Sequence, residues 1–214
     1  MTGGGQIIDV VTQLTRRLRL RWLLGVRVPR DCKIGRNVSI AGDVRIEPGV
    51  KIDDNVILNG NILVGANCHI HRYAHIHGNI ILGGKCAVGS FAILSTAPDG
   101  TIRVGAESYV NSYNIIGANA SIAIGDRCIF AAFVQITDAS HGIDDLSVAT
   151  IYSTSSAAPV RIGDNVWLGS GVMVMMGSSI GNDSVVGAQS LVRGDLPERS
   201  ISFGTPAKVQ RIRE

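Results

Sequence analysis

The sequence has few aromatic residues and little net charge. Phe, Trp and Tyr make up 5% of its 214 residues, and 20 Lys and Arg nearly balance 17 Asp and Glu, so the formal net charge is +3. So small a charge argues only weakly for a polyanionic partner, and scarce aromatics argue against a platform for stacked nucleic-acid bases. The sequence shows no signal peptide and no apolar run long enough to span a bilayer, which predicts a cytoplasmic location.

Cysteine is also scarce, and its positions are regular. The chain has Cys32, Cys68, Cys86 and Cys128, each two residues before a position of the repeat described next. We interpret them as small apolar core residues of one structural column, in preference to metal or redox centres. Cys68 and Cys86 would lie in adjacent coils, where a disulfide is geometrically conceivable, but nothing else in the sequence indicates an oxidising compartment.

In contrast, glycine is abundant. One stretch has an aliphatic residue at every sixth position, eleven times in succession, and chance would give such a run with odds on the order of one in a million. The positions are Ile34, Ile40, Ile46, Ile52, Leu58, Val64, Ile70, Ile76, Leu82, Val88 and Leu94. Six is a multiple of the strand period of two, so one residue per hexapeptide faces the same side of a short strand. Because Gly, Asn and Asp fill the places between, the pattern predicts a parallel β-helix with three faces and about 18 residues per coil.

The period continues towards the C-terminus with three interruptions. It resumes at Val104 after four extra residues, at Ile124 after two more and at Ile162 after twenty more. With three faces per coil, all three insertions leave between the second and third face, so they should stack at one corner. Long loops on rigid scaffolds are commonly functional. We therefore expect the longest insertion, 137–159, to form one wall of a site.

The chain divides into three predicted segments. Residues 1–28 hold a Gly-rich start and, over about 6–24, a helix-spaced apolar stripe with several arginines. We expect an amphipathic α-helix that covers the first coil, with contact to anionic lipid as the alternative. Residues 29–197 should form the β-helix with its protruding loop, and 198–214 a C-terminal tail.

A histidine-rich run lies in the third coil and invites a metal hypothesis. Its members are His69, His71, His75 and His77. Because Ile70 and Ile76 should point inward, alternation places all four histidines outward on two faces, where they would not converge within one subunit. We interpret them as solvent or interface residues and expect no metal site. A metal shared across a subunit interface is the residual alternative.

Three C-terminal segments resemble a known family. They are Ile162-Gly-Asp-Asn-Val-Trp-Leu-Gly169, Val186-Gly-Ala-Gln-Ser190 and Gly204-Thr-Pro-Ala-Lys208. With the hexapeptide period and the histidine loop, they resemble the hexapeptide-repeat acyltransferases, in particular maltose and galactoside O-acetyltransferases and surface-glycan acetyltransferases. The resemblance covers about residues 30–214. It implies an all-β fold, a left-handed parallel β-helix of hexapeptide repeats with an N-terminal α-helix and a protruding loop; the spacing alone does not give this handedness.

The resemblance also implies roles for catalytic residues. His141 matches the family's general base, and Asn111 matches an asparagine that helps to hold the acceptor. A carboxylate beside an imidazole can orient it and raise its basicity, which makes Asp138 or Asp144 a candidate. For either carboxylate, a solvated position on the loop is an equal alternative. A backbone N–H near Gly169–Ser170 would stabilise the oxyanion.

The implied cofactor is acetyl-CoA, used as co-substrate, with no metal required. Small residues would let the thin pantetheine arm approach the backbone, and cations suit its nucleotide phosphates. The predicted cofactor-binding residues are Trp167, Gly169, Ser170, Ala188, Arg193, Lys208 and Arg211. Arg193 departs from the family, in which small or hydroxyl residues are common at this position. The family's acidic acceptor-binding helix is also not recognisable, so the acceptor cannot be carried over.

The resulting hypothesis is an acetyl-CoA-dependent O-acetyltransferase that acts on a hydroxyl of a sugar or glycan intermediate. The resemblance implies a homotrimer with sites between subunits and no nucleic-acid partner. The basic N-terminal segment favours a membrane-associated glycan pathway, such as surface polysaccharide biosynthesis. The alternatives are an N-acetyltransferase on an amino sugar, an antibiotic acetyltransferase, a γ-carbonic-anhydrase-like metal hydratase and a non-catalytic scaffold.

Overall fold

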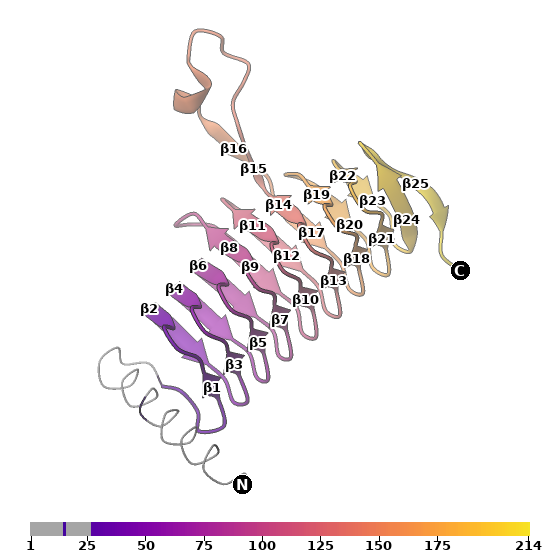
Figure 1. Ribbon diagram of the computed structural model, residues 1–214. Helices are drawn as coiled ribbons and strands as arrows, with labels where there is room; N and C mark the ends of the chain where they lie inside the picture. Colours follow the sequence, from indigo (N-terminus) through magenta and orange to yellow (C-terminus); the bar gives the residue numbers. More distant parts are fainter. Residues whose placement is uncertain (1–14, 16–26) are drawn as a thin grey trace.

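The protein is an all-β solenoid of about nine turns, seen here in a computed structural model that describes Thr15 and residues 27–214 (Figure 1). The predicted N-terminal helix over about 6–24 lies, Thr15 apart, outside the described residues. Within residues 27–214 the only helix is the 3₁₀ turn η1 (Thr150–Tyr152). No helix in the described part of the chain is long and apolar enough to cross a membrane.

The first face of the solenoid is a ten-stranded sheet whose last strand is antiparallel to its neighbour. Its strands are β1 (Lys33–Ile34), β3 (Lys51–Ile52), β5 (His69–Ile70), β7 (Ala87–Val88), β10 (Tyr109–Val110), β13 (Ile129–Phe130), β18 (Trp167–Leu168), β21 (Val185–Val186), β24 (Ser200–Gly204) and the antiparallel β25 (Ala207–Ile212). The predicted tail, 198–214, thus begins as a further strand of this face and returns as β25.

The second and third faces form one thirteen-stranded sheet. They are continuous because three long strands, β2 (Ser39–Ile46), β4 (Ile57–Val64) and β6 (His75–Leu82), run across their shared corner. Further along, the second face holds β8 (Ile93–Thr96), β11 (Ile115–Ala118), β14 (Gln135–Thr137), β19 (Met173–Val174) and β22 (Leu191–Val192), and the third holds β9 (Thr101–Val104), β12 (Ser121–Ile124), β17 (Val160–Ile162), β20 (Ser179–Ile180) and β23 (Asp195–Leu196).

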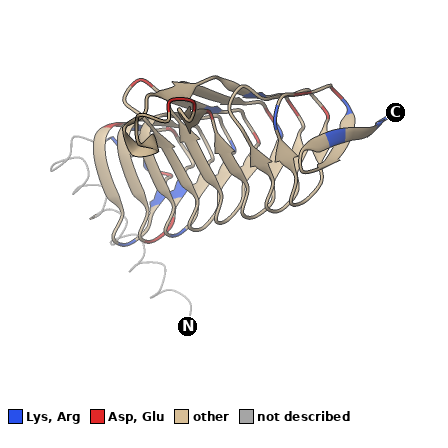
Figure 2. Ribbon diagram, turned by 90° about the horizontal axis from the view of Figure 1, so that it is seen from above, with Lys and Arg blue, Asp and Glu red and all other residues tan. Residues whose placement is uncertain are grey.

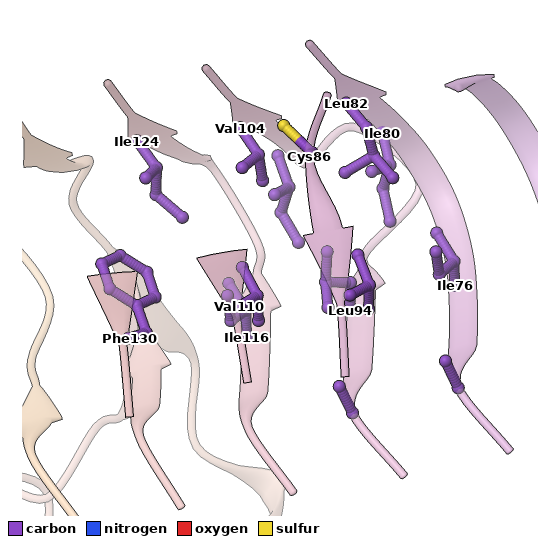
Figure 3. Close-up of a cluster of buried hydrophobic side chains, with 14 of the residues drawn as sticks. Ile76, Ile80, Leu82, Cys86, Leu94, Val104, Val110, Ile116, Ile124 and Phe130 are labelled. Carbon is purple, nitrogen blue, oxygen red and sulfur yellow. The ribbon is translucent and has the colours of Figure 1, made fainter. Parts of the chain in front are cut away.

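The six-residue period is the core of the solenoid, as predicted. Ile34 pairs with Ile52, and Ile52 with Ile70, so each repeat position lies directly beside its equivalent in the next coil. All eleven aliphatic positions of the period are buried. Figure 3 shows such side chains filling the interior, where Phe130 is the largest fully buried one. Burial of this continuous apolar column stabilises coils that have no hydrophobic core of their own.

The corner between the second and third faces, here called the insertion corner, behaves as predicted. In the early coils Gly42, Gly60 and Gly78 stack there with positive φ angles of 85°, 134° and 102°. In the next three coils the insertions leave between β8 and β9, β11 and β12, and β14 and β17. A bend at this corner needs a backbone that ordinary side chains do not tolerate, so the chain uses either glycine or an inserted loop.

The cysteines are buried and free, as predicted for small core residues. Each thiol also donates to a backbone carbonyl at the corner between the third and first faces. For example, Cys68 Sγ lies 3.0 Å from the carbonyl oxygen of Gly83, and Cys86 Sγ lies 2.8 Å from that of Gly105. Ser108 occupies the same column and donates its hydroxyl to Gly125 O at 2.9 Å. The column therefore supplies small donors that satisfy buried carbonyls.

Candidate active site

His141 is presented on a hairpin that projects from the insertion corner, away from the first face (Figure 1). The hairpin consists of β15 (Ala139–His141) and the antiparallel β16 (Ser155–Ala157), in which His141 pairs with Ser155. The His141 side chain is exposed, and its ring makes no hydrogen bond within the described residues. It is therefore accessible to a molecule that approaches the hairpin.

The base of this hairpin is anchored by Asp138, which is fully buried. Its carboxylate accepts hydrogen bonds from the N–H groups of Asn119 at 2.7 Å and Ala120 at 2.9 Å, in the preceding insertion. On the returning strand, the N–H of Ala158 donates to the Asp138 carbonyl, and Gly177 N–H donates to Ala158 O. Asp138 thus fixes the loop to its neighbouring coils, which assigns its carboxylate to the backbone and not to the His141 ring.

Asp144 lies further out on the same loop and is exposed. Within the described residues it makes no hydrogen bond or ion pair with His141. The neighbouring Asp145 instead stabilises a turn, because its carboxylate accepts from both the hydroxyl and the N–H of Ser147. These bonds lower the pKa of Asp145. Orientation of the imidazole by Asp144 stays a prediction.

Four of the predicted cofactor-binding residues gather on the first face and at the corner between the first and second faces. Trp167 projects outward from β18 with 53% of its surface exposed. Gly169 and Ser170 follow it at that corner, and Ala188 lies in the same place one coil further on. A Cβ at Gly169 would lie 2.6 Å from the nitrogen of Ala188, so only glycine allows this close approach of the two coils.

The basic residues of the tail continue the same face. Trp167 pairs with Val185, Val185 with Ile201 and Ile201 with Arg211, which places the tryptophan and the arginine in one row of the sheet. Three strand spacings separate them by about 14 Å. Lys208 and Arg211 are exposed on β25, where Figure 2 shows blue segments near the C-terminus. A cation at this distance from Trp167 suits an elongated molecule with phosphates at one end.

Arg193, in contrast, lies at the insertion corner, after β22. Its neighbour Gly194 donates its N–H to Ser178 Oγ and accepts from Ser179 N–H, one coil beyond the place where Gly177 contacts the histidine loop. The predicted cofactor-binding residues are therefore divided between two parts of the solenoid, the insertion corner and the first face with its corner to the second face. Arg193 shares its edge with His141, and the other six share the first face and its corner.

Asn111 also lies away from His141, after β10 at the corner between the first and second faces. Its side-chain oxygen accepts a hydrogen bond from Ser112 N–H at 2.7 Å.

Sequence reasoning missed a ladder of stacked rings at the corner between the first and second faces, formed by Tyr73, Phe91, Tyr113 and Phe133 with centroids 4.8, 5.2 and 5.1 Å apart. Their position, three residues after each first-face repeat residue, was the available signal.

The prediction that the histidines do not converge within one subunit is wrong for two of them. His75 and His77 lie on β6 and face outward, as expected. His69 and His71, however, converge with Asp53 of the preceding coil. Strand alternation within one coil gives the direction of each side chain, but the third member of this cluster comes from 16 residues earlier in the chain.

Comparisons with known proteins agree with this architecture. Residues 159–194 match a family described as bacterial transferase hexapeptide (six repeats). The chain is 42% identical over 107 residues to the putative lipopolysaccharide biosynthesis O-acetyl transferase WbbJ of Escherichia coli K12, covering 47% of this chain and 55% of that protein. It is 36% identical over 111 residues to the galactoside O-acetyltransferase of Lactococcus lactis, covering 51% and 52%.

Solved structures show the same fold. The polysialic acid O-acetyltransferase OatWY superposes with a TM-score of 0.62 at 22% identity, covering 85% of this chain and 88% of that one. The acetyltransferase VCA0836 of Vibrio cholerae, solved with acetyl-CoA, gives 0.50 at 21% identity, covering 99% and 91%. The chain is therefore similar to hexapeptide-repeat transferases over residues 159–194 and to O-acetyltransferases over about half its length. It spans about half the length, or less, of the curated relatives named with it.

Proposed function

We propose that this protein transfers the acetyl group of acetyl-CoA to a hydroxyl of a sugar or glycan intermediate. The observation that carries the proposal is the presentation of an exposed His141 on a hairpin whose base is held by the buried Asp138. Two relatives, one of lipopolysaccharide biosynthesis and one acting on galactosides, support a glycan acceptor.

In the proposed reaction His141 is the general base. Its neutral imidazole accepts the proton of the acceptor hydroxyl while the oxygen attacks the thioester carbon. The tetrahedral intermediate then collapses, the carbon–sulfur bond breaks, and the imidazolium returns the proton to the CoA thiolate. The products are an acetyl ester and free CoA.

The first face would hold acetyl-CoA. Trp167, Gly169, Ser170 and Ala188 offer a flat ring and close backbone for the pantetheine arm, and Lys208 and Arg211 are placed for the phosphates. Of the two proposed oxyanion donors, Gly169 N–H already donates to Val186 O at 2.8 Å. Ser170 N–H donates to no protein acceptor in the described residues and is the better candidate.

The site would be completed by a second copy of the chain. His141 leaves the insertion corner, whereas Asn111 and Trp167 belong to the first face and its corner, so one prism presents the two halves in different directions. A homotrimer in which the loop of one subunit meets the first face of its neighbour unites them. Left-handed winding of the coil is part of the same proposal.

The test is a titration of acetyl-CoA into the purified protein, followed by assays with a panel of sugars and amino sugars. We expect saturable binding at about one site per chain and ester formation on a hydroxyl acceptor. The His141→Ala variant should lose about 10²–10⁴-fold in kcat and still bind acetyl-CoA. The His75→Ala variant, which changes an exposed histidine on β6, is the matched control. Turnover of His141→Ala within a few-fold of wild type would refute the general-base role, and amide products alone would refute O-acetylation.

A further inference from the structure

Two imidazoles and one carboxylate meet on the first face, near the N-terminal end of the solenoid. His69 Nε2 lies 3.1 Å from Asp53 Oδ1, and His71 Nδ1 lies 3.5 Å from Asp53 Oδ2. The two rings have centroids 3.8 Å apart, and one donor atom from each residue lies within 4.8 Å of the others. All three side chains are partly buried: the exposed fraction is 29% for His69, 31% for His71 and 19% for Asp53.

The solenoid itself produces this arrangement. Because Ile70 points into the core, His69 and His71 on either side of it point out together. Asp53 occupies the same position in its coil as His71 does in the next, and strand pairing holds the two coils in register. The cluster is therefore fixed by three backbone positions and not by flexible loops.

We infer that Asp53, His69 and His71 form a binding site for one divalent transition-metal ion of the zinc type. Bonds of 2.0–2.1 Å to a tetrahedral ion separate neighbouring donor atoms by about 3.3 Å, close to the 3.1 Å from His69 Nε2 to Asp53 Oδ1 and the 3.5 Å from His71 Nδ1 to Asp53 Oδ2. One donor atom from each residue lies within 4.8 Å of the others, so a single ion would draw the three groups together. Two nitrogens and one oxygen are a ligand set that zinc accepts, and the fourth position stays open to water or a small ligand.

One neighbouring group bears on the strength of this site. The ammonium group of Lys51 competes for the carboxylate, since its Nζ lies 3.3 Å from Asp53 Oδ1. The lysine side chain is half exposed and can turn to solvent when an ion takes its place.

The site is separate from the proposed acetyl-transfer site. Along the first face, His69 pairs with Ala87 and the row continues through Tyr109 and Ile129 to Trp167. Four strand spacings therefore separate His69 from Trp167 by about 19 Å. We therefore expect metal occupancy to leave acetyl-CoA binding unchanged.

The experiment is a titration of metal-free, tag-free protein with Co²⁺ and Zn²⁺, followed by calorimetry and by the visible absorption of bound cobalt. We expect one ion per chain, with a cobalt spectrum of nitrogen and oxygen ligands. His69→Ala, His71→Ala and Asp53→Asn should each weaken binding about 100-fold or more, since even outer-shell partners of metal ligands contribute 10–100-fold. Lys51→Ala should tighten binding several-fold, because it removes the competing cation. His75→Ala and His77→Ala are matched controls, and circular dichroism verifies the fold of each variant.

Several results would overturn the inference. Absence of stoichiometric binding, or equal losses in the His75→Ala and His77→Ala controls, would show that the cluster is only an ion pair with a neighbouring imidazole. A thiolate-to-cobalt charge-transfer band would assign the ion to the cysteines. If a substitution at His69 prevented folding, the Lys51→Ala variant would decide. If the cluster binds no metal, removal of Lys51 should not raise the affinity of the protein for Co²⁺ or Zn²⁺.

Discussion

The carboxylate of Asp138 accepts a hydrogen bond from the backbone N–H of Asn119, 2.7 Å away and 19 residues earlier in the chain. This bond connects the second insertion to the third, so that the hairpin carrying His141 rises from a corner already stiffened by its neighbour. The sequence presented Asp138 as a loop carboxylate near a histidine, whereas its burial assigns it to the support of the loop.

Removal of the Asp138 charge should therefore lower both stability and turnover. Asp138→Asn replaces one acceptor oxygen by an NH₂ group that faces a backbone N–H, and weakens a second bond. Hydrogen bonds to a charged group contribute about 1.5–3 kcal/mol each, so we expect the free energy of unfolding to fall by about 2–4 kcal/mol in urea denaturation. The exposed Asp144→Asn should change it by less than about 0.5 kcal/mol. Equal effects of the two substitutions would contradict this assignment.

Mixing of two inactive variants should restore activity if the site lies between subunits. His141→Ala and Trp167→Ala damage opposite halves of the proposed site, and refolding of an equal mixture forms random trimers. About a quarter of the sites then combine an intact loop with an intact first face. We expect about 25% of wild-type activity in the mixture and almost none in either variant alone. An inactive mixture whose mixed trimers are verified by native mass spectrometry would place the site within one chain.

Arg211 should bind the phosphates of acetyl-CoA. Because the residue is exposed on β25 in the same row as Trp167, Arg211→Ala should raise the Kd for acetyl-CoA about 10–100-fold, the effect of one charge-assisted hydrogen bond. Acetyl-pantetheine lacks the nucleotide and should bind wild type and variant alike. Gln210→Ala, one residue earlier, is the control. An unchanged Kd for acetyl-CoA would exclude Arg211 from the site.

Gly60 should tolerate no side chain. Its φ of 134° lies in the region that favours glycine, and an added Cβ would collide with the carbonyl oxygen of Gly78 and lie 2.7 Å from its nitrogen. Gly60→Ala should therefore destabilise the protein by about 3 kcal/mol or more, from backbone strain and collision together. Gly194 has a φ of 102° with no atom within 4 Å of an added Cβ, so Gly194→Ala should cost only the strain, about 1–2 kcal/mol. Thermal unfolding of both variants measures the difference.

The cysteine thiols should be unreactive in the folded protein. All four thiols are buried, so reagents cannot reach them. Burial also raises the pKa of Cys128, which keeps that thiol protonated and reduces the thiolate that reagents attack. Labelling with a disulfide reagent at about pH 8 should modify none of the four thiols until denaturant is added. Cys86→Ser should preserve stability within about 1 kcal/mol, because Ser108 makes the same bond in the same column. Rapid labelling of native protein would contradict the buried column.

Much of the fold follows from the sequence alone, for a local reason. Successive side chains of a strand point to opposite sides, so the run from Ile34 to Leu94 identified the core positions without any tertiary contact. The interruptions of the period after Leu94 identified the insertion corner. The same counting placed the four cysteines in one column. It also found the long loop that bears His141, because an insertion interrupts the period wherever it occurs.

Only the tertiary structure decided which outward residues meet. A coil of 18 residues, lengthened by insertions, sets residues far apart in sequence beside each other, and periodicity gives the direction of a side chain but not its partner in the next coil. For this reason the sequence did not reveal that Asp53 lies beside His71 or that Asp138 lies beside Asn119. It also did not reveal that Arg193 and Arg211 lie at different edges of the solenoid. The sequence thus determined the prism, and stacking of its coils determined the constellations on its surface.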